Sequence, residues 1–201
     1  MGYMYFHLFK RCAGCPLPRT TRNCQMRGFT LLEVMVVVAI LGVLAALAGP
    51  SFGPLIERWR VRQAVESMTS TLYYARSEAI RRGGSVVIEK IPKTTPGCTL
   101  ADTAEEWGCG WFVFVDTSGD GKWSAGEEIL RSVTTPPNTD VIHKPSGTSI
   151  KIDRYGMMGG LNTQSFIFSP ASTGISSPAT RAICTASGGR IKAIEAASCP
   201  L

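Results

Sequence analysis

Residues 28–50 read GFTLLEVMVVVAILGVLAALAGP, and this stretch decides the first half of the fold. From Phe29 to Gly49 it provides roughly the 20 apolar residues that an α-helix rising about 1.5 Å per residue needs to cross a bilayer core. The segment before it, residues 1–28, is basic and contains no acid; its charged residues are Lys10, Arg11, Arg19, Arg22 and Arg27. By the positive-inside bias, this pattern predicts a single-pass membrane anchor whose N terminus stays in the cytoplasm while the rest is exported.

Glu33 is the one charged residue inside the apolar stretch. An ionised carboxylate costs about 2.5 kcal/mol or more at the centre of a membrane helix, so Glu33 needs a partner. In an ordinary secretory signal the cleavage site follows a shorter apolar region, whereas here the candidate site at Gly28 precedes the apolar region. The alternative is a plain signal anchor that carries a Glu by chance.

The run Gly28-Phe29-Thr30-Leu31-Leu32-Glu33 resembles the processing signal of type IV pilins and type II secretion pseudopilins. The resemblance implies that prepilin peptidase removes residues 1–28 as a leader and methylates Phe29. It implies that Glu33 pairs with the N-terminal amine of a neighbouring pilin or pseudopilin, and that Pro50 bends the helix. It also implies location in the cell inner membrane, with residues 29–49 as the transmembrane and assembly helix and the C-terminal part in the periplasm.

A second helical pattern follows the apolar stretch. Between Leu55 and Arg82 the apolar residues recur every three or four positions, as on one face of a helix; they are Val61, Val65, Met68, Leu72, Ala75 and Ala79. Gly83 and Gly84 predict its end, because Gly tolerates the positive φ of a helix C-cap. We therefore expect residues 50–84 to form an amphipathic continuation of the first helix, with one face packed on a core.

Residues 85–201 have the pattern of a β-rich domain. Short runs typical of strands alternate with turn residues; the runs are Ser85–Lys90, Trp111–Asp116, Glu128–Val133, Ser149–Arg154, Ser165–Ser169, Arg181–Thr185 and Arg190–Ile194. The predicted fold is α+β and pilin-like, with a long N-terminal helix, membrane-spanning in its first half, packed on antiparallel strands.

Several segments are similar to the GspH/FimT family of minor pilins and pseudopilins. They are residues 75–82 (ARSEAIRR), 110–116 (GWFVFVD), 120–121 (DG) and 126–131 (GEEILR). Together with the N-terminal segment, the resemblance covers nearly all of the chain after Arg27. It implies a subunit of a type IV pilus or of a type II secretion pseudopilus, with other pilins or pseudopilins as partners.

The seven cysteines divide at the predicted cleavage point. Cys12, Cys15 and Cys24 precede Gly28, and the even remainder is Cys98, Cys109, Cys184 and Cys199. These four allow three disulfide pairings, of which the short separations favour Cys98 with Cys109 and Cys184 with Cys199. A zinc site is the rival, but its ligands usually come in closer pairs.

The charge of the exported part is unevenly distributed. The formal net charge of +6 includes five charges from the leader, so the mature chain carries only about +1. Residues 85–140 hold four basic and nine acidic groups, whereas residues 141–201 hold six basic and two acidic groups. A polyanion would therefore meet the C-terminal part.

Gly189-Arg190-Ile191-Lys192 is similar to the Gly-Arg-x-Arg motif that FimT proteins use for DNA binding in natural transformation. The final Lys keeps the charge but lacks the bidentate guanidinium. On a strand, Arg190 and Lys192 share a face and could contact phosphates of non-specific DNA; other basic residues that could enlarge the patch are Lys144, Lys151, Arg154 and Arg181. The alternative is a solvated edge strand whose charges discourage aggregation.

Residues 116–127 (DTSGDGKWSAGE) have the donor spacing of an EF-hand calcium loop, with oxygen ligands on Asp116, Ser118, Asp120 and Glu127. The flanking runs are of β type rather than helical, so we expect a hairpin turn and no cofactor, with calcium as the less favoured reading. With only His7 and His143 as histidines and no nucleophile or phosphate-loop motif, the chain is not expected to be an enzyme.

Overall fold

The computed structural model describes residues 29–48, 52–159, 163–186 and 188–199. The chain divides into two compact units between Ala46 and Leu47. The first contains most of helix α1 (Leu31–Ala48), and the second contains helix α2 (Gly53–Arg82) and all of the strands. The predictions for Gly28, for Pro50 and for the leader concern residues outside the described ranges.

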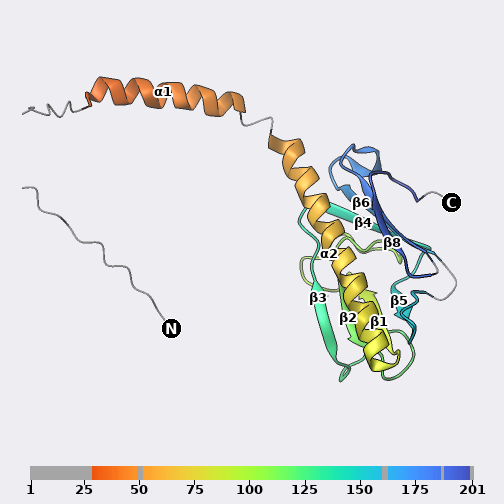
Figure 1. Cartoon of the computed structure of the whole chain (residues 1–201). Coiled ribbons are helices and arrows are strands. Elements are labelled where there is room, and N and C mark those ends of the chain that lie inside the picture. Colours follow the sequence, from red (N-terminus) through yellow and green to blue (C-terminus); the bar gives the residue numbers. More distant parts are fainter. Residues whose placement is uncertain (1–28, 49–51, 160–162, 187, 200–201) are drawn as a thin grey trace, which may run out of the picture. The chain divides into compact units, whose positions relative to one another are not determined.

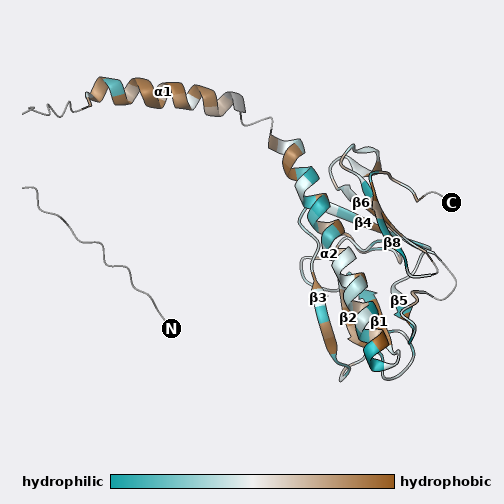
Figure 2. Cartoon of the chain, viewed as in Figure 1, coloured by the Kyte–Doolittle hydropathy of each residue, from teal (hydrophilic) through white to brown (hydrophobic). Residues whose placement is uncertain are grey.

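Helix α1 begins with a side-chain cap. The Glu33 backbone N–H donates to Thr30 Oγ1 over 3.2 Å, which satisfies one of the free donors at the helix N terminus. The residues of α1 are apolar apart from the first turn (Figure 2), and every one of its side chains whose burial is described is exposed. Within the described part of the chain, no helix meets the length and hydropathy needed to cross a membrane.

Helix α2 buries one face along most of its length. The buried face contains the predicted apolar residues Val61, Val65, Met68, Leu72, Ala75 and Ala79, together with Ala64 and Thr71. The helix ends at Arg82 because Gly83 takes the left-handed conformation, with φ of 76°. The Gly84 N–H then donates to the Ala79 carbonyl over 2.8 Å.

Two four-stranded antiparallel sheets lie against α2 (Figure 1). The first has the order β3-β2-β1-β5 and the second the order β4-β6-β7-β8. The strands are β1 (Val86–Lys90), β2 (Trp111–Val115), β3 (Ile129–Val133), β4 (Thr139–Lys144), β5 (Ser149–Ile152), β6 (Gln164–Pro170), β7 (Arg181–Thr185) and β8 (Ile191–Ile194). The expected α+β fold with a helix packed on antiparallel strands is confirmed.

Strand β4 was not expected from the sequence. Its residues read TDVIHK, and the Asp, His and Lys make the segment look like a polar loop. In the structure Val141 and His143 point into the core, and β4 pairs with β6 over its whole length. Its pairing partner, β6, begins about twenty residues further along the chain, so no local sequence pattern predicts the strand.

The hydrophobic core lies between α2 and both sheets. Trp111 from the first sheet and Phe166 from the second are fully buried in one cluster with Met68 of the helix. Trp111 Nε1 also donates to Thr71 Oγ1 over 3.1 Å, so the buried indole N–H has a partner. The three layers therefore share one core.

Two disulfides close the loops around this core. Cys98 is bonded to Cys109 between β1 and β2, and Cys184 of β7 is bonded to Cys199 beyond β8. These are the pairs that the sequence separations favour. The second bond ties the C-terminal segment to the sheet that carries Arg190 and Lys192.

Candidate functional site

The basic motif, Gly189-Arg190-Ile191-Lys192, begins in the turn between β7 and β8 and continues into β8. The Ala186 N–H donates to the Arg190 carbonyl over 2.9 Å, and the Gly189 N–H donates to the Ala186 carbonyl over 2.8 Å. Lys192 pairs in register with Cys184, and Arg190 comes directly before β8. Both cationic side chains are exposed, and β8 forms an edge of its sheet.

Arg190 and Lys192 line the same groove, which has a volume of about 580 Å³. Lys144, at the end of β4, lines it as well, and the Cys184–Cys199 disulfide forms part of its wall. Among the described residues that line the groove, none is acidic. The three cations give this concave surface a positive potential, which favours anions over cations.

Only one of the four additional basic residues considered from the sequence lines this groove. Lys144 does, although its Nζ is also 3.2 Å from Glu105 Oε2. Arg181 forms an ion pair with Glu195. Lys151 and Arg154 belong to β5 and the turn after it: Lys151 donates to the Gly119 carbonyl over 2.6 Å, and Arg154 lies over the Tyr155 ring.

Arg76 of α2 positions the basic turn, and this contact was not foreseen. Its Nη1 donates to the Gly189 carbonyl over 2.7 Å. A Cβ at Gly189 would lie 2.6 Å from that nitrogen, and the φ of Gly189 is +79°. On the other side of the arginine, a Cβ at Gly156 would lie 2.7 Å from Arg76 Cγ. The guanidinium is the flexible end of its side chain and can shift, so it is the left-handed backbone that favours Gly at this position of the motif.

A buried histidine lies beneath the groove. His143 Nε2 is 2.7 Å from the side-chain amide of Gln164, which itself lines the groove, and Nδ1 donates to the Gly147 carbonyl over 3.1 Å. The ring stacks on Phe166 at 4.8 Å between centroids. Burial lowers the pKa of His143 below 6.5, although both hydrogen bonds oppose this shift.

The loop with EF-hand spacing is a hairpin loop between the antiparallel strands β2 and β3. Asp116 accepts hydrogen bonds from the N–H groups of Gly119 and Gly121 over 2.7 and 2.9 Å. Glu127 accepts from three backbone N–H groups, which lower the pKa of its carboxyl group, that of Ser124 most. The carboxylates of Asp116 and Glu127 therefore stabilise the loop by accepting hydrogen bonds from its own backbone. In the described ranges, no group of three or more His, Cys, Asp or Glu residues could hold a metal.

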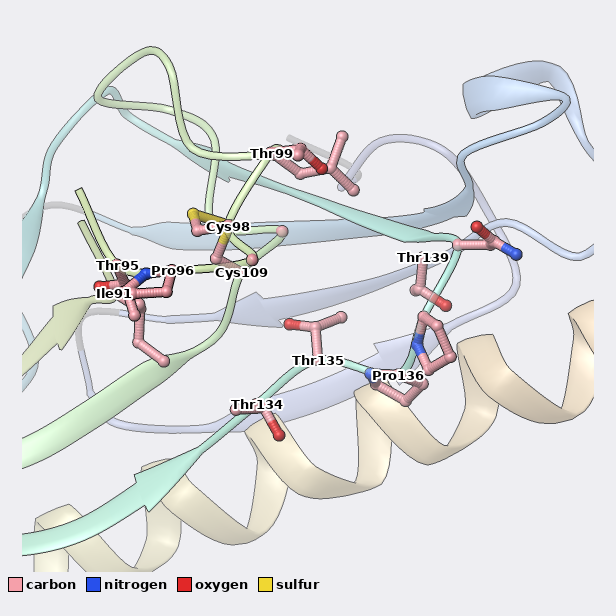
Figure 3. Close-up of a pocket in the computed structure, with 15 residues that line it drawn as sticks. Ile91, Thr95, Pro96, Cys98, Thr99, Cys109, Thr134, Thr135, Pro136 and Thr139 are labelled. Atoms are coloured by element: carbon pink, nitrogen blue, oxygen red, sulfur yellow. A yellow bond between two sulfur atoms is a disulfide. The ribbon is translucent and has the colours of Figure 1, made fainter. Parts of the chain in front are cut away.

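A second cavity, of about 420 Å³, is neutral (Figure 3). The Cys98–Cys109 disulfide lies on one side of it, and the segment from Thr134 to Pro136 on the other. No charged side chain is among its described lining residues, which are mainly Thr, Pro and Gly. This lining offers hydroxyl groups but no ion-pairing group to an anion, unlike the basic groove.

Two residues at the start of the described part of the chain are exposed in this structure. The Phe29 side chain is 79% exposed, and Glu33 is exposed in the first turn of α1.

A helix packed on antiparallel sheets, preceded by an apolar N-terminal segment, is the fold of a type IV pilin-like protein. Residues 24–49 match a family model described as the prokaryotic N-terminal methylation motif. Residues 64–189 match the family described as type II transport protein GspH, and the chain belongs to this family. Pilin and pseudopilin families consist of structural subunits rather than enzymes.

Individual relatives are pilins. A fimbrial protein of Pseudomonas aeruginosa is 45% identical over 69 residues, which are 34% of this chain and 44% of the relative. The pilin-like protein PilA1 of Thermus thermophilus is 35% identical over 103 residues, or 51% of this chain and 56% of the relative. This chain thus spans about half the length of the relatives it matches.

The fold also matches a solved structure. A crystal structure of the type IV minor pilin FimU of Pseudomonas aeruginosa superposes with a TM-score of 0.53 at 19% identity, covering 70% of this chain and 97% of FimU. At this identity the likeness shows a shared pilin fold.

Proposed function

We propose that this chain is a minor pilin or pseudopilin that joins a type IV pilus or a type II secretion pseudopilus through its N-terminal helix. The observation that carries the proposal is the N-terminal methylation motif joined to a GspH domain in one chain. The subunit is anchored by residues 29–49 in the inner membrane, with the domain in the periplasm, where oxidising conditions suit its two disulfides.

Maturation proceeds by cleavage between Gly28 and Phe29 and methylation of Phe29. Glu33 then pairs with the N-terminal amine of a neighbouring subunit, because a carboxylate inside lipid requires a counter-charge. The exposure of Glu33 on α1 supports this role. By the same resemblance, Pro50 bends the N-terminal helix.

Intact-mass analysis of protein extracted from membranes tests this proposal, with cells that contain or lack prepilin peptidase. The expected species in competent cells begins at methylated Phe29 and lacks four cysteine hydrogens. In peptidase-deficient cells we expect the uncut chain. An uncut chain in competent cells would overturn the proposal.

A second function is favoured by the basic groove. The convergence of Lys144, Arg190 and Lys192 on one groove supports binding of DNA phosphates during DNA uptake. Phosphate contacts carry no base information, so the binding would be independent of sequence. The resemblance of residues 189–192 to the FimT motif supports the same function.

DNA binding is tested by fluorescence anisotropy with duplex DNA at several salt concentrations. Three phosphate contacts predict a slope of about −2.7 for log K against log salt, and Arg190→Ala or Lys192→Ala should each reduce its magnitude by about 0.9. Lys122→Ala is the matched control, since Lys122 is exposed in the β2–β3 loop and does not line the groove. Equal salt slopes for the parent and all variants would contradict DNA binding in this groove. Only the proposed role as a pilin or pseudopilin subunit would then remain.

A further inference from the structure

The first two turns of α2 carry an apolar stripe that the domain does not cover. Phe52, Leu55, Ile56 and Trp59 follow the spacing of one helical face, and their side chains are 52%, 61%, 46% and 65% exposed. At about 100° per residue, this stripe lies roughly opposite the face that α2 buries in the core. Figure 2 shows hydrophobic residues at the start of α2.

The stripe is short, and its flanks are basic. Further along the same face come Gln63, Glu66 and Ser70, so the apolar surface ends after Trp59. Arg60 and Arg62 project roughly 70–90° to either side of the stripe.

Glu57 is on the domain side of the helix, where its Oε1 accepts a hydrogen bond from Ser172 Oγ over 2.8 Å. Two other acids lie on the Arg62 side: Glu66 is exposed four positions after Arg62, and Arg62 contributes to lowering the pKa of the Glu195 carboxyl group. The exposed surface at this end of α2 is therefore apolar in the centre, with Arg60 at one edge and Arg62 and its neighbouring acids at the other.

We infer that this stripe is a lipid-binding surface that lies on the anionic membrane leaflet from which the chain emerges. Apolar residues with Trp in the centre and Arg at the margins are the pattern of helices that insert into the headgroup region. The stripe begins four residues after α1 ends, and it extends only over the turns nearest to α1 in sequence. A membrane surface would cover those turns and no more.

The inference rests on the proposed membrane anchorage, and the fluorescence of Trp59 in the full-length chain tests it. The chain is reconstituted in nanodiscs of phosphatidylethanolamine and phosphatidylglycerol, with or without bromine atoms on the acyl chains. Trp107 and Trp111 are fully buried, and Trp123→Phe removes the remaining exposed indole. Comparison with a variant that also carries Trp59→Phe isolates the Trp59 emission.

We expect brominated lipid to quench Trp59, at a depth of about 5–10 Å into the headgroup boundary, and aqueous iodide to leave it unquenched. Quenching by iodide but not by brominated lipid would overturn the inference. Protection from both quenchers only when several chains share a disc would also overturn it, and would assign the stripe to a second subunit. A chain that fails to enter the discs would instead contradict the anchorage.

Two pairs of variants separate the apolar and the cationic contributions. Leu55→Gln with Ile56→Gln should abolish quenching by brominated lipid, whereas Ile80→Gln, an apolar residue of α2 that is 53% exposed, should not. The double change of Arg60→Gln with Arg62→Gln should remove the dependence of this Trp59 quenching on the phosphatidylglycerol content of the disc. Arg81→Gln, at the other end of the helix, should preserve that dependence. Equal effects of both arginine changes would contradict the inference that the stripe binds lipid.

Discussion

Among single residues, Gly189 shows how a left-handed backbone conformation favours glycine at one position. Its neighbour Gly188 has open space around the position of a Cβ, whereas a Cβ at Gly189 would meet the Arg76 guanidinium. The left-handed backbone at Gly189 adds a second penalty for any other residue. Two adjacent glycines in one turn therefore have different tolerances.

We predict that Gly189→Ala lowers the free energy of unfolding by about 1–2 kcal/mol, the cost of an L-residue in the left-handed region. The Arg76 guanidinium should shift away from the new methyl group, which weakens its hydrogen bond to the residue 189 carbonyl. Urea denaturation measures the change in the free energy of unfolding. Gly188→Ala is the control and should stay close to the parent; equal losses in the two variants would contradict the role of the left-handed backbone at Gly189.

His143 predicts a pH dependence. Its folded pKa lies below the unfolded value of 6.5 because burial disfavours the imidazolium, so its contribution to stability is complete above pH 6.5 and is lost as the pH falls through the folded pKa. Glu105 lies nearby and opposes the shift only weakly. His143→Gln should therefore flatten the decline of unfolding free energy below pH 6.5. Parallel pH profiles for the parent and the variant would show that another group is responsible.

At the scale of the element, a buried lysine organises the loop between β1 and β2. Lys90, at the end of β1, is 7% exposed, and its Nζ donates to the carbonyls of Ala101, Thr103 and Glu106. Burial lowers the pKa of Lys90. Together with the Cys98–Cys109 bond, this ammonium holds an irregular segment in one conformation.

Lys90→Met should lower the free energy of unfolding by about 1–3 kcal/mol, because it leaves buried carbonyl groups without a donor. Hydrogen exchange of the residues between Cys98 and Cys109 should rise in the same variant. Lys93→Met is the control: the Lys93 side chain is 65% exposed, so its loss should change stability by no more than about 0.5 kcal/mol. Unchanged exchange in Lys90→Met would mean that the disulfide alone orders the segment.

At the scale of the whole molecule, α2 joins two sheets that do not pair with each other in one continuous ladder. Met68 is fully buried in the cluster that includes Trp111 of one sheet and Phe166 of the other. Because both sheets depend on the same helix face, we expect them to unfold together.

Met68→Ala should lower the stability by about 2–5 kcal/mol, as large-to-small changes in a packed core do. Tryptophan fluorescence and far-ultraviolet circular dichroism should still report a single coincident transition. Glu66→Ala, an exposed change on the same helix, should alter stability little. Two separated transitions in Met68→Ala would indicate that each sheet has a core of its own.

Features that depend on local order along the chain could be predicted from the amino-acid sequence. The apolar residues of 29–49 and the spacing of Val61 to Ala79 are adjacent or periodic, so helix type and burial follow from the chain alone. Most of the strands correspond closely to short β-type runs between turn residues. The hairpin character of residues 116–127 followed from the β-type runs beside it.

Only the tertiary structure decided which distant residues meet. Strand β4 pairs with β6 along its whole length, and its buried His143 has partners in Gln164 and Gly147, which no local pattern encodes. The groove gained Lys144 but not Lys151, because β4 and β5 belong to different sheets although they are neighbours in sequence. Arg76 reached Gly189 across 113 positions. Such contacts depend on how the sheets pack around α2, because packing brings together side chains whose separation along the chain carries no signal.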